Sequence, residues 1–177
     1  MAAILYNGLG RHQEALAAGR QASEHKHIYV SVSTLPELIE AAVRTGSTRM
    51  AGDALDLLTE RTRAGGTEGG LGIEARARAL LSEGQTAEGY HREALDWLGR
   101  TRRRPDLARA HLLYGEWLRR QGRRRDARDQ VRTAVEMFDA MGMEAFGAGL
   151  GLSCAPPASG PARGIPGRRW CSPRKKR

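Results

Sequence analysis

Aromatic residues and cysteines are scarce in this sequence of 177 residues, and their scarcity limits what the chain can be. Phe, Trp and Tyr make up 5% of the residues, so a core must be built from Leu, Ala and Val. Such a core suits closely packed helices better than a β-sandwich. The only cysteines, Cys154 and Cys171, lie near the C-terminus, so no disulfide framework can hold the rest of the chain. A reducing cytoplasm is the expected location.

Long apolar runs are missing as well. The longest uncharged window, residues 145–162, contains Pro156, Pro157 and Pro161 together with several glycines, so it cannot form a membrane-spanning helix. The N-terminus lacks the basic start and the apolar stretch of a signal peptide. The sequence therefore predicts neither a membrane protein nor an exported one.

Positive charge is concentrated at one end of the chain. Residues 1–146 carry 22 Lys and Arg against 20 Asp and Glu, whereas residues 147–177 carry seven basic residues and no acidic one. This second segment is rich in Gly and Pro and has no helical period, so it cannot bury enough apolar surface to offset the entropy lost on ordering. We expect a disordered basic tail, either genuine or the product of a shifted reading frame. A nearly neutral body weakens the net charge of +9 as evidence for nucleic-acid binding.

Apolar residues recur with a helical period in four successive pairs of segments. Thr34 and Glu37 have the spacing of a capping box and predict the start of the third helix, and Gly46 predicts its end. Residues 62–72 are predicted to form the longest loop. The four pairs are residues 2–9 and 13–24, then helices following Thr34 and Gly46, then 73–82 and 87–98, and last a hairpin over 106–142 hinged at Gln121 and Gly122.

Small residues repeat along the second helix of each pair. Ala15, Ala54, Ala94 and Ala127 are spaced by 39, 40 and 33 residues, close to the tetratricopeptide period of about 34. Gly115 is placed where the two helices of the last pair should cross closely. One helical hairpin cannot bury its apolar face alone, but stacked hairpins can. The sequence therefore predicts an all-α fold, with tetratricopeptide-like hairpins stacked as a short solenoid over residues 1–146.

No catalytic or metal centre can be recognised in the sequence. The phosphate-loop pattern GxxxxGK[ST] and the hydrolase pattern GxSxG do not occur. His25 and His27 are better explained as a solvated helix end than as metal ligands, and Cys154 and Cys171 lack a companion ligand. His91 and His111 are expected to be partly buried core histidines, and Trp97, Tyr114 and Trp117 are expected in the core and not as stacking platforms. We predict no enzymatic activity, no cofactor and no bound metal.

Two groups of arginines need an explanation. Arginines clustered near helix ends can bind anions. The alternative, which we favour, is a solvated turn neutralised by Asp106, Asp126 and Asp129. The first group is Arg100, Arg102, Arg103 and Arg104, and the second is Arg119, Arg120, Arg123, Arg124 and Arg125.

Three stretches carry a family resemblance: residues 72–82, 90–95 and 107–120. The phrase ARAHLLYGEWLRR, residues 108–120, is the most distinctive of them. Together these stretches resemble the region just before the DNA-binding domain in large ATP-binding LuxR-type transcriptional regulators. Members of that family carry an ATPase module, a long helical-repeat region and a C-terminal helix-turn-helix. Here only the repeats have a counterpart, because there is no phosphate loop and the sequence after Phe146 turns into the Gly/Pro/Arg tail.

The resemblance implies a fragment or truncated relative of such a regulator, which keeps the region that senses an effector or partner. In tetratricopeptide hairpins the first helix lines the binding groove, and a protein or small-molecule effector is the expected occupant. A free-standing adaptor that binds a peptide in this groove is the alternative, and nucleic-acid binding by the tail and the hinge arginines is a third option. Neither ATPase activity nor sequence-specific DNA binding is expected of this chain. In the fourth pair the predicted groove-lining residues are Arg109, Leu112, Glu116, Arg119 and Arg120.

Overall fold

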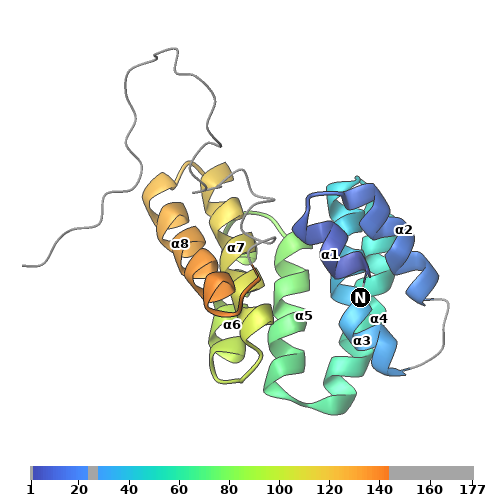
Figure 1. The fold of residues 1–177 in the computed structure, drawn as a ribbon. Helices are drawn as coiled ribbons and strands as arrows, with labels where there is room; N and C mark the ends of the chain where they lie inside the picture. Colours follow the sequence, from blue (N-terminus) through green and yellow to red (C-terminus); the bar gives the residue numbers. More distant parts are fainter. Residues whose placement is uncertain (1, 24–27, 144–177) are drawn as a thin grey trace, which may run out of the picture.

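The computed structural model describes residues 2–23 and 28–143, and the side chains of 2–21 and 34–143 within them. All regular structure in these residues is α-helical, with each helix packed against the next along the chain (Figure 1). The predicted all-α class is therefore confirmed. The helices are α1 (Ala2–Gly8), α2 (His12–Ser23), α3 (Ile28–Arg44), α4 (Thr48–Gly65), α5 (Glu68–Leu81), α6 (Gly84–Gly99), α7 (Arg104–Arg120) and α8 (Arg124–Ala140).

A left-handed glycine marks the turn inside each helical pair. Gly10, Gly46, Gly84 and Gly122 have φ values of 72°, 76°, 56° and 77°, a conformation that side chains with a Cβ rarely adopt. They are spaced by 36, 38 and 38 residues, which is more regular than the alanine spacing seen in the sequence. The predicted hinge at Gln121 and Gly122 is confirmed. The winding of the pairs into a solenoid stays a prediction.

The third helix begins earlier than the capping box predicts. α3 starts at Ile28, so Thr34 lies inside the helix and its assignment as a cap is wrong. Pro36 also lies inside, where a proline removes one backbone hydrogen bond at a cost of about 3 kcal/mol. Leu35, Leu38 and Ile39 on the same helix are almost fully buried. At about 2 kcal/mol each, their burial offsets the cost of the proline.

The long loop predicted at residues 62–72 does not exist. Only Gly66 and Thr67 separate α4 from α5; Gly66 ends α4 in a left-handed conformation, and the Thr67 hydroxyl caps α5 by accepting from the Gly70 N–H at 3.2 Å. Three glycines of this stretch, Gly69, Gly70 and Gly72, lie at close contacts within α5. A Cβ on Gly72 would come within 2.6 Å of Leu98 Cγ on α6, so Gly72 permits the two helices to cross.

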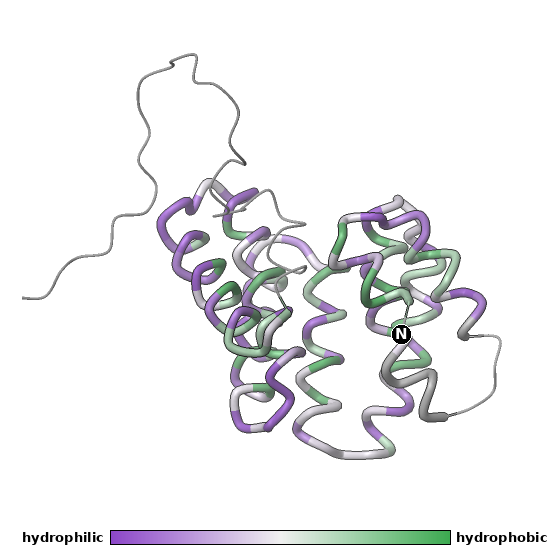
Figure 2. Tube along the Cα trace, viewed as in Figure 1, coloured by the Kyte–Doolittle hydropathy of each residue, from purple (hydrophilic) through white to green (hydrophobic). Residues whose placement is uncertain are grey.

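Small residues stand where helices pack, as the repeat predicts. Ala15, Ala54, Ala94 and Ala127 are all buried, and hydrophobic and hydrophilic residues alternate along the helices (Figure 2). Gly115 lies at the crossing of α7 and α8, as expected. Leu, Ala and Ile side chains of α3, α4 and α5 dominate the largest apolar cluster.

The aromatic residues are only partly where they were expected. Tyr114 and Trp117 are buried and lie beside His91, which is buried too. Trp97 is only half-buried; its indole N–H donates to Glu93, and the Arg100 guanidinium lies 4.9 Å over its ring. The core assignment is thus confirmed for Tyr114, Trp117 and His91 and wrong for Trp97.

Several expectations concern residues outside the described part of the chain. They are the disordered tail with its boundary after residue 146, the histidines His25 and His27, and the thiols Cys154 and Cys171. Within the described residues, no helix has the length and apolar character needed to cross a membrane.

Candidate functional site

The five predicted groove residues occupy three different environments on α7. Arg109 is buried, and Glu116, with 14% of its side chain exposed, makes an ion pair toward α3. Arg119 and Arg120 are exposed at the end of the helix. Leu112 is 1% exposed and belongs to the apolar cluster with Ala134 and Phe138 of α8, so it cannot line an open groove. Leu112 instead packs α7 against α8, the second helix of the same pair. The prediction of a groove residue did not take this contact into account.

Arg109 forms a two-pronged ion pair with Glu40 of α3. Its Nε donates to Glu40 Oε2 at 3.1 Å, and its Nη2 donates to Glu40 Oε1. The two side chains are 8% and 1% exposed. The planar guanidinium matches the carboxylate in this arrangement, which fixes the orientation of both groups.

Both members of this pair are charged at neutral pH. Burial by itself raises the pKa of Glu40, but the charge and hydrogen bonds of Arg109 and the charge of Arg44 bring it below its usual value. Burial by itself lowers the pKa of Arg109, yet attraction to Glu40 and Glu37 raises it overall. Each charge thus depends on the other, because an unpaired charge at this depth is costly.

Arg44 extends the contact between α3 and α7 toward solvent. Its Nη2 bonds to Glu116 Oε2 on α7 and lies 3.6 Å from Glu40 Oε1 on its own helix. The Arg44 side chain is 25% exposed. This end of the contact is therefore the part that a molecule in solution could reach.

Arg76 connects α5 to the same group of charges. Its Nη2 lies 3.5 Å from Glu37 Oε1, and its Nη1 lies 3.6 Å from Asp106 Oδ1 on α7. These distances are longer than those of the pair between Arg109 and Glu40. Arg76 is 3% exposed, so α5 contributes a buried charge between α3 and α7.

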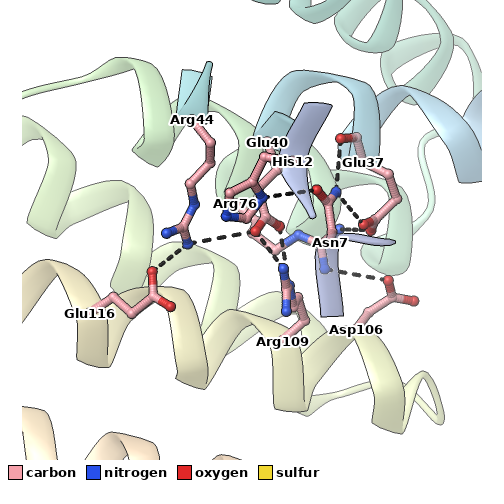
Figure 3. A network of polar contacts seen from close by, with 9 residues as sticks. All are labelled: Asn7, His12, Glu37, Glu40, Arg44, Arg76, Asp106, Arg109 and Glu116. Atoms are coloured by element: carbon pink, nitrogen blue, oxygen red, sulfur yellow. Dashed lines mark hydrogen bonds and ion pairs between the residues drawn. The ribbon is translucent and has the colours of Figure 1, made fainter. Parts of the chain in front are cut away.

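The first helical pair joins through Asn7 and His12. The Asn7 amide donates to the Glu37 carbonyl and to Glu37 Oε2, both at 2.9 Å, and Asn7 Oδ1 lies 3.5 Å from His12 Nδ1. Burial, and then the charge of Arg44, lowers the pKa of His12, so the ring is neutral at pH 7. All four helical pairs therefore contribute to one charged network (Figure 3). It consists of Asn7, His12, Glu37, Glu40, Arg44, Arg76, Asp106, Arg109 and Glu116.

Comparison with family models, curated proteins and solved structures finds no match for this chain. Among the described residues, no three His, Cys, Asp or Glu side chains are grouped so that they could hold a metal ion.

Most of the charged network was missed in the sequence. Glu40, Arg44 and Arg76 were not singled out, and Glu37 was assigned to a helix cap. Glu37, Glu40 and Arg44 are spaced by three and four residues, which places them on one face of α3. Charges at such spacing next to a buried apolar stripe were the available signal.

The expected neutralisation of the arginine groups holds for some of their members. Asp106 pairs with Arg103 at 2.7 Å, and Asp126 pairs with Arg123 at 2.8 Å. Asp129 pairs with an arginine outside both groups, Arg132, at 3.0 Å. These three aspartates therefore do not neutralise every hinge arginine.

Proposed function

We propose that this chain is the helical-repeat region of a LuxR-type transcriptional regulator, which senses an effector or partner and lacks an ATPase or DNA-binding module of its own. The family resemblance of residues 72–82, 90–95 and 107–120 supports the regulator class. The charged network supports the sensing role. The protein acts in the cytoplasm in this proposal, and it carries out no chemical reaction.

The link between α3 and α7 is the observation that carries the proposal. In a stack of helical repeats each unit contacts mainly its neighbours. Arg109 and Glu40, and likewise Arg44 and Glu116, instead join the fourth pair to the second. Because such contacts skip one pair, a change at one of them alters how non-adjacent pairs sit relative to each other.

A charged effector would act at the exposed end of this link. Arg44 and Glu116 are the accessible members of the link. A carboxylate from a partner would compete with Glu116 for Arg44, and a guanidinium would compete with Arg44 for Glu116. An effector shifts a conformational equilibrium only by its differential affinity for the two states. The two states here are the one in which Arg44 and Glu116 are paired and the one in which they are separated. The effector has higher affinity for the separated state, since only that state offers both groups to it.

The regulator assignment is tested by the gene itself. Genomic DNA downstream of codon 146 should be translated in all three frames. A helix-turn-helix of the LuxR type in a shifted frame supports a fragment of a regulator. Absence of such a segment from all three frames contradicts it and favours the free-standing peptide-binding adaptor.

A further inference from the structure

Four arginines at the turn between α7 and α8 have no acidic partner in the described part of the chain. Arg119 and Arg120 end α7, and Arg124 and Arg125 begin α8. All four are exposed. We call this group the arginine tip.

Neighbouring acidic groups are already committed to other arginines. Asp126 pairs with Arg123 at 2.8 Å, and Glu88 Oε1 accepts from Arg123 and from Arg92, each at 2.6 Å. The hydrogen bond from Arg123 is also the main reason that the pKa of Glu88 lies below its usual value. Residues 119–132 contain seven Arg and two Asp, so charge of one sign is left over.

The position of Arg124 and Arg125 is unfavourable for the isolated protein. Positive side chains in the first turn of a helix oppose its dipole. No side chain caps the N-terminus of α8. A bound anion would relieve both conditions, because it would pair with the guanidinium groups at the positive end of the helix.

We propose that the arginine tip binds the phosphate backbone of nucleic acid without reading its sequence. Guanidinium groups pair with phosphates through two parallel hydrogen bonds, and backbone contacts carry no sequence information. The inference is independent of the proposed sensing role, because it uses none of the residues of the charged network.

An acidic protein fits this surface less well than nucleic acid. The centres of protein interfaces are apolar and aromatic. In the described residues the exposed large apolar side chains are Leu5 on α1, Leu9 in the turn that follows it, and Leu57 on α4, and none belongs to the tip. Figure 2 shows hydrophilic residues on both sides of the turn between α7 and α8.

The test compares two variants of the full chain with equal loss of charge. One replaces the tip, as R119Q/R120Q/R124Q/R125Q. The control, R11Q/R20Q/R49Q/R63Q, removes the same charge from exposed arginines that lie outside both arginine groups. The C-terminal segment is kept in both, so its contribution is constant. Circular dichroism and urea unfolding confirm that both variants fold.

Binding is measured by fluorescence anisotropy with two labelled DNA duplexes of unrelated sequence and with polyglutamate, between about 50 and 200 mM salt. We expect the tip variant to bind DNA at least about tenfold more weakly at the lower salt, with the slope of log K against log salt shallower by about 3–4. The DNA affinity of the control variant should change less than about threefold. The unmodified chain should bind the two duplexes with equal affinity.

Three results would overturn the proposal. If the tip and control variants lost DNA affinity equally, binding would be due to overall charge or to the C-terminal segment. A preference above about tenfold, or 1.4 kcal/mol, for one duplex would indicate sequence reading. Tighter, tip-dependent binding of polyglutamate than of DNA would assign the surface to an acidic protein.

Discussion

Arg109 of α7 and Glu40 of α3, 69 positions apart in the sequence, are joined by a buried two-pronged ion pair that connects two non-adjacent helical pairs. Replacing Arg109 with Met leaves Glu40 buried, with Arg44 at 3.6 Å as its remaining close partner. We expect Arg109→Met to lower the free energy of unfolding by about 3–5 kcal/mol in urea denaturation.

An exposed ion pair provides the matched control for this substitution. Asp129 and Arg132 on α8 have side chains 52% and 67% exposed, so Arg132→Met should cost at most about 1 kcal/mol. A loss below about 1 kcal/mol for Arg109→Met as well would show that the buried pair does not hold the helices together.

Gly115 should not tolerate even an alanine. A Cβ at this position would lie 2.7 Å from Val131 Cγ2 and 3.1 Å from the Ala127 carbonyl oxygen on α8. The carbonyl cannot move without the helix, so overpacking should cost about 1–3 kcal/mol. This exceeds the helix-propensity gain of up to about 1 kcal/mol.

Thermal or urea unfolding of three variants separates packing from propensity at Gly115. Gly89 on α6 has nothing within 4 Å of its would-be Cβ, so Gly89→Ala should be stabilising. Val131→Ala in the Gly115→Ala background should recover part of the lost stability. If Gly115→Ala stabilised the protein as Gly89→Ala does, the close crossing of α7 and α8 would be wrong.

His91 should make stability depend on pH between about 4 and 6.5. Burial, and then the charge of Arg120, lowers its pKa to about 4, although Glu88 opposes this shift. The folded ring stays neutral over a range in which the unfolded ring binds a proton. Stability is therefore complete above about pH 6.5 and decreases as the pH falls, by about 3 kcal/mol at pH 4.

His91→Phe isolates this effect from other groups that titrate in acid. His12, whose pKa is also lowered, destabilises the fold in the same direction, and Glu40 loses its contribution at lower pH. Both remain in the variant. The difference in unfolding free energy between the variant and the unmodified chain should therefore change between pH 7 and pH 4. A difference that is constant over this range would show that His91 is not buried neutral.

Local features of the sequence predicted local features of the fold. Gly122 predicted the last hinge, and the recurring alanines and Gly115 predicted where helices pack, because each depends on neighbours close in the sequence. The loop predicted at residues 62–72 was wrong, because Gly72 lies inside α5, where it makes room for Leu98. The capping-box spacing of Thr34 and Glu37 was misleading in α3, which begins at Ile28 and continues through Pro36, since burial of the apolar face outweighs one lost hydrogen bond.

The candidate site was harder to predict, because its contacts are long-range. Arg109 and Glu116 were predicted to line a groove, but Arg109 is buried and both make ion pairs within the protein. Their partners lie 69 and 72 positions away, and no periodicity along one helix identifies them. Leu112 shows the complementary error, in which the helix face toward α8 was mistaken for the open face. The arginine tip was recognised as a cluster, but its lack of partners depends on which aspartates bind which arginines.

In the proposed sensing role, the charged network fixes the second and fourth helical pairs relative to each other. The distance between α4 and α8 can be measured by double electron–electron resonance with spin labels at Asp56→Cys and Asp139→Cys, two exposed positions. Cys154 and Cys171 are first replaced with Ser, so that only these two positions are labelled. The unmodified network should give one narrow distance distribution, and Glu40→Gln with Arg109→Gln should broaden it while helicity is retained. Asp129→Asn with Arg132→Gln, an exposed pair within α8, should leave it unchanged. If the distance distribution stayed narrow and unshifted after loss of the Glu40 and Arg109 charges, the buried pair would not be what fixes the two helical pairs.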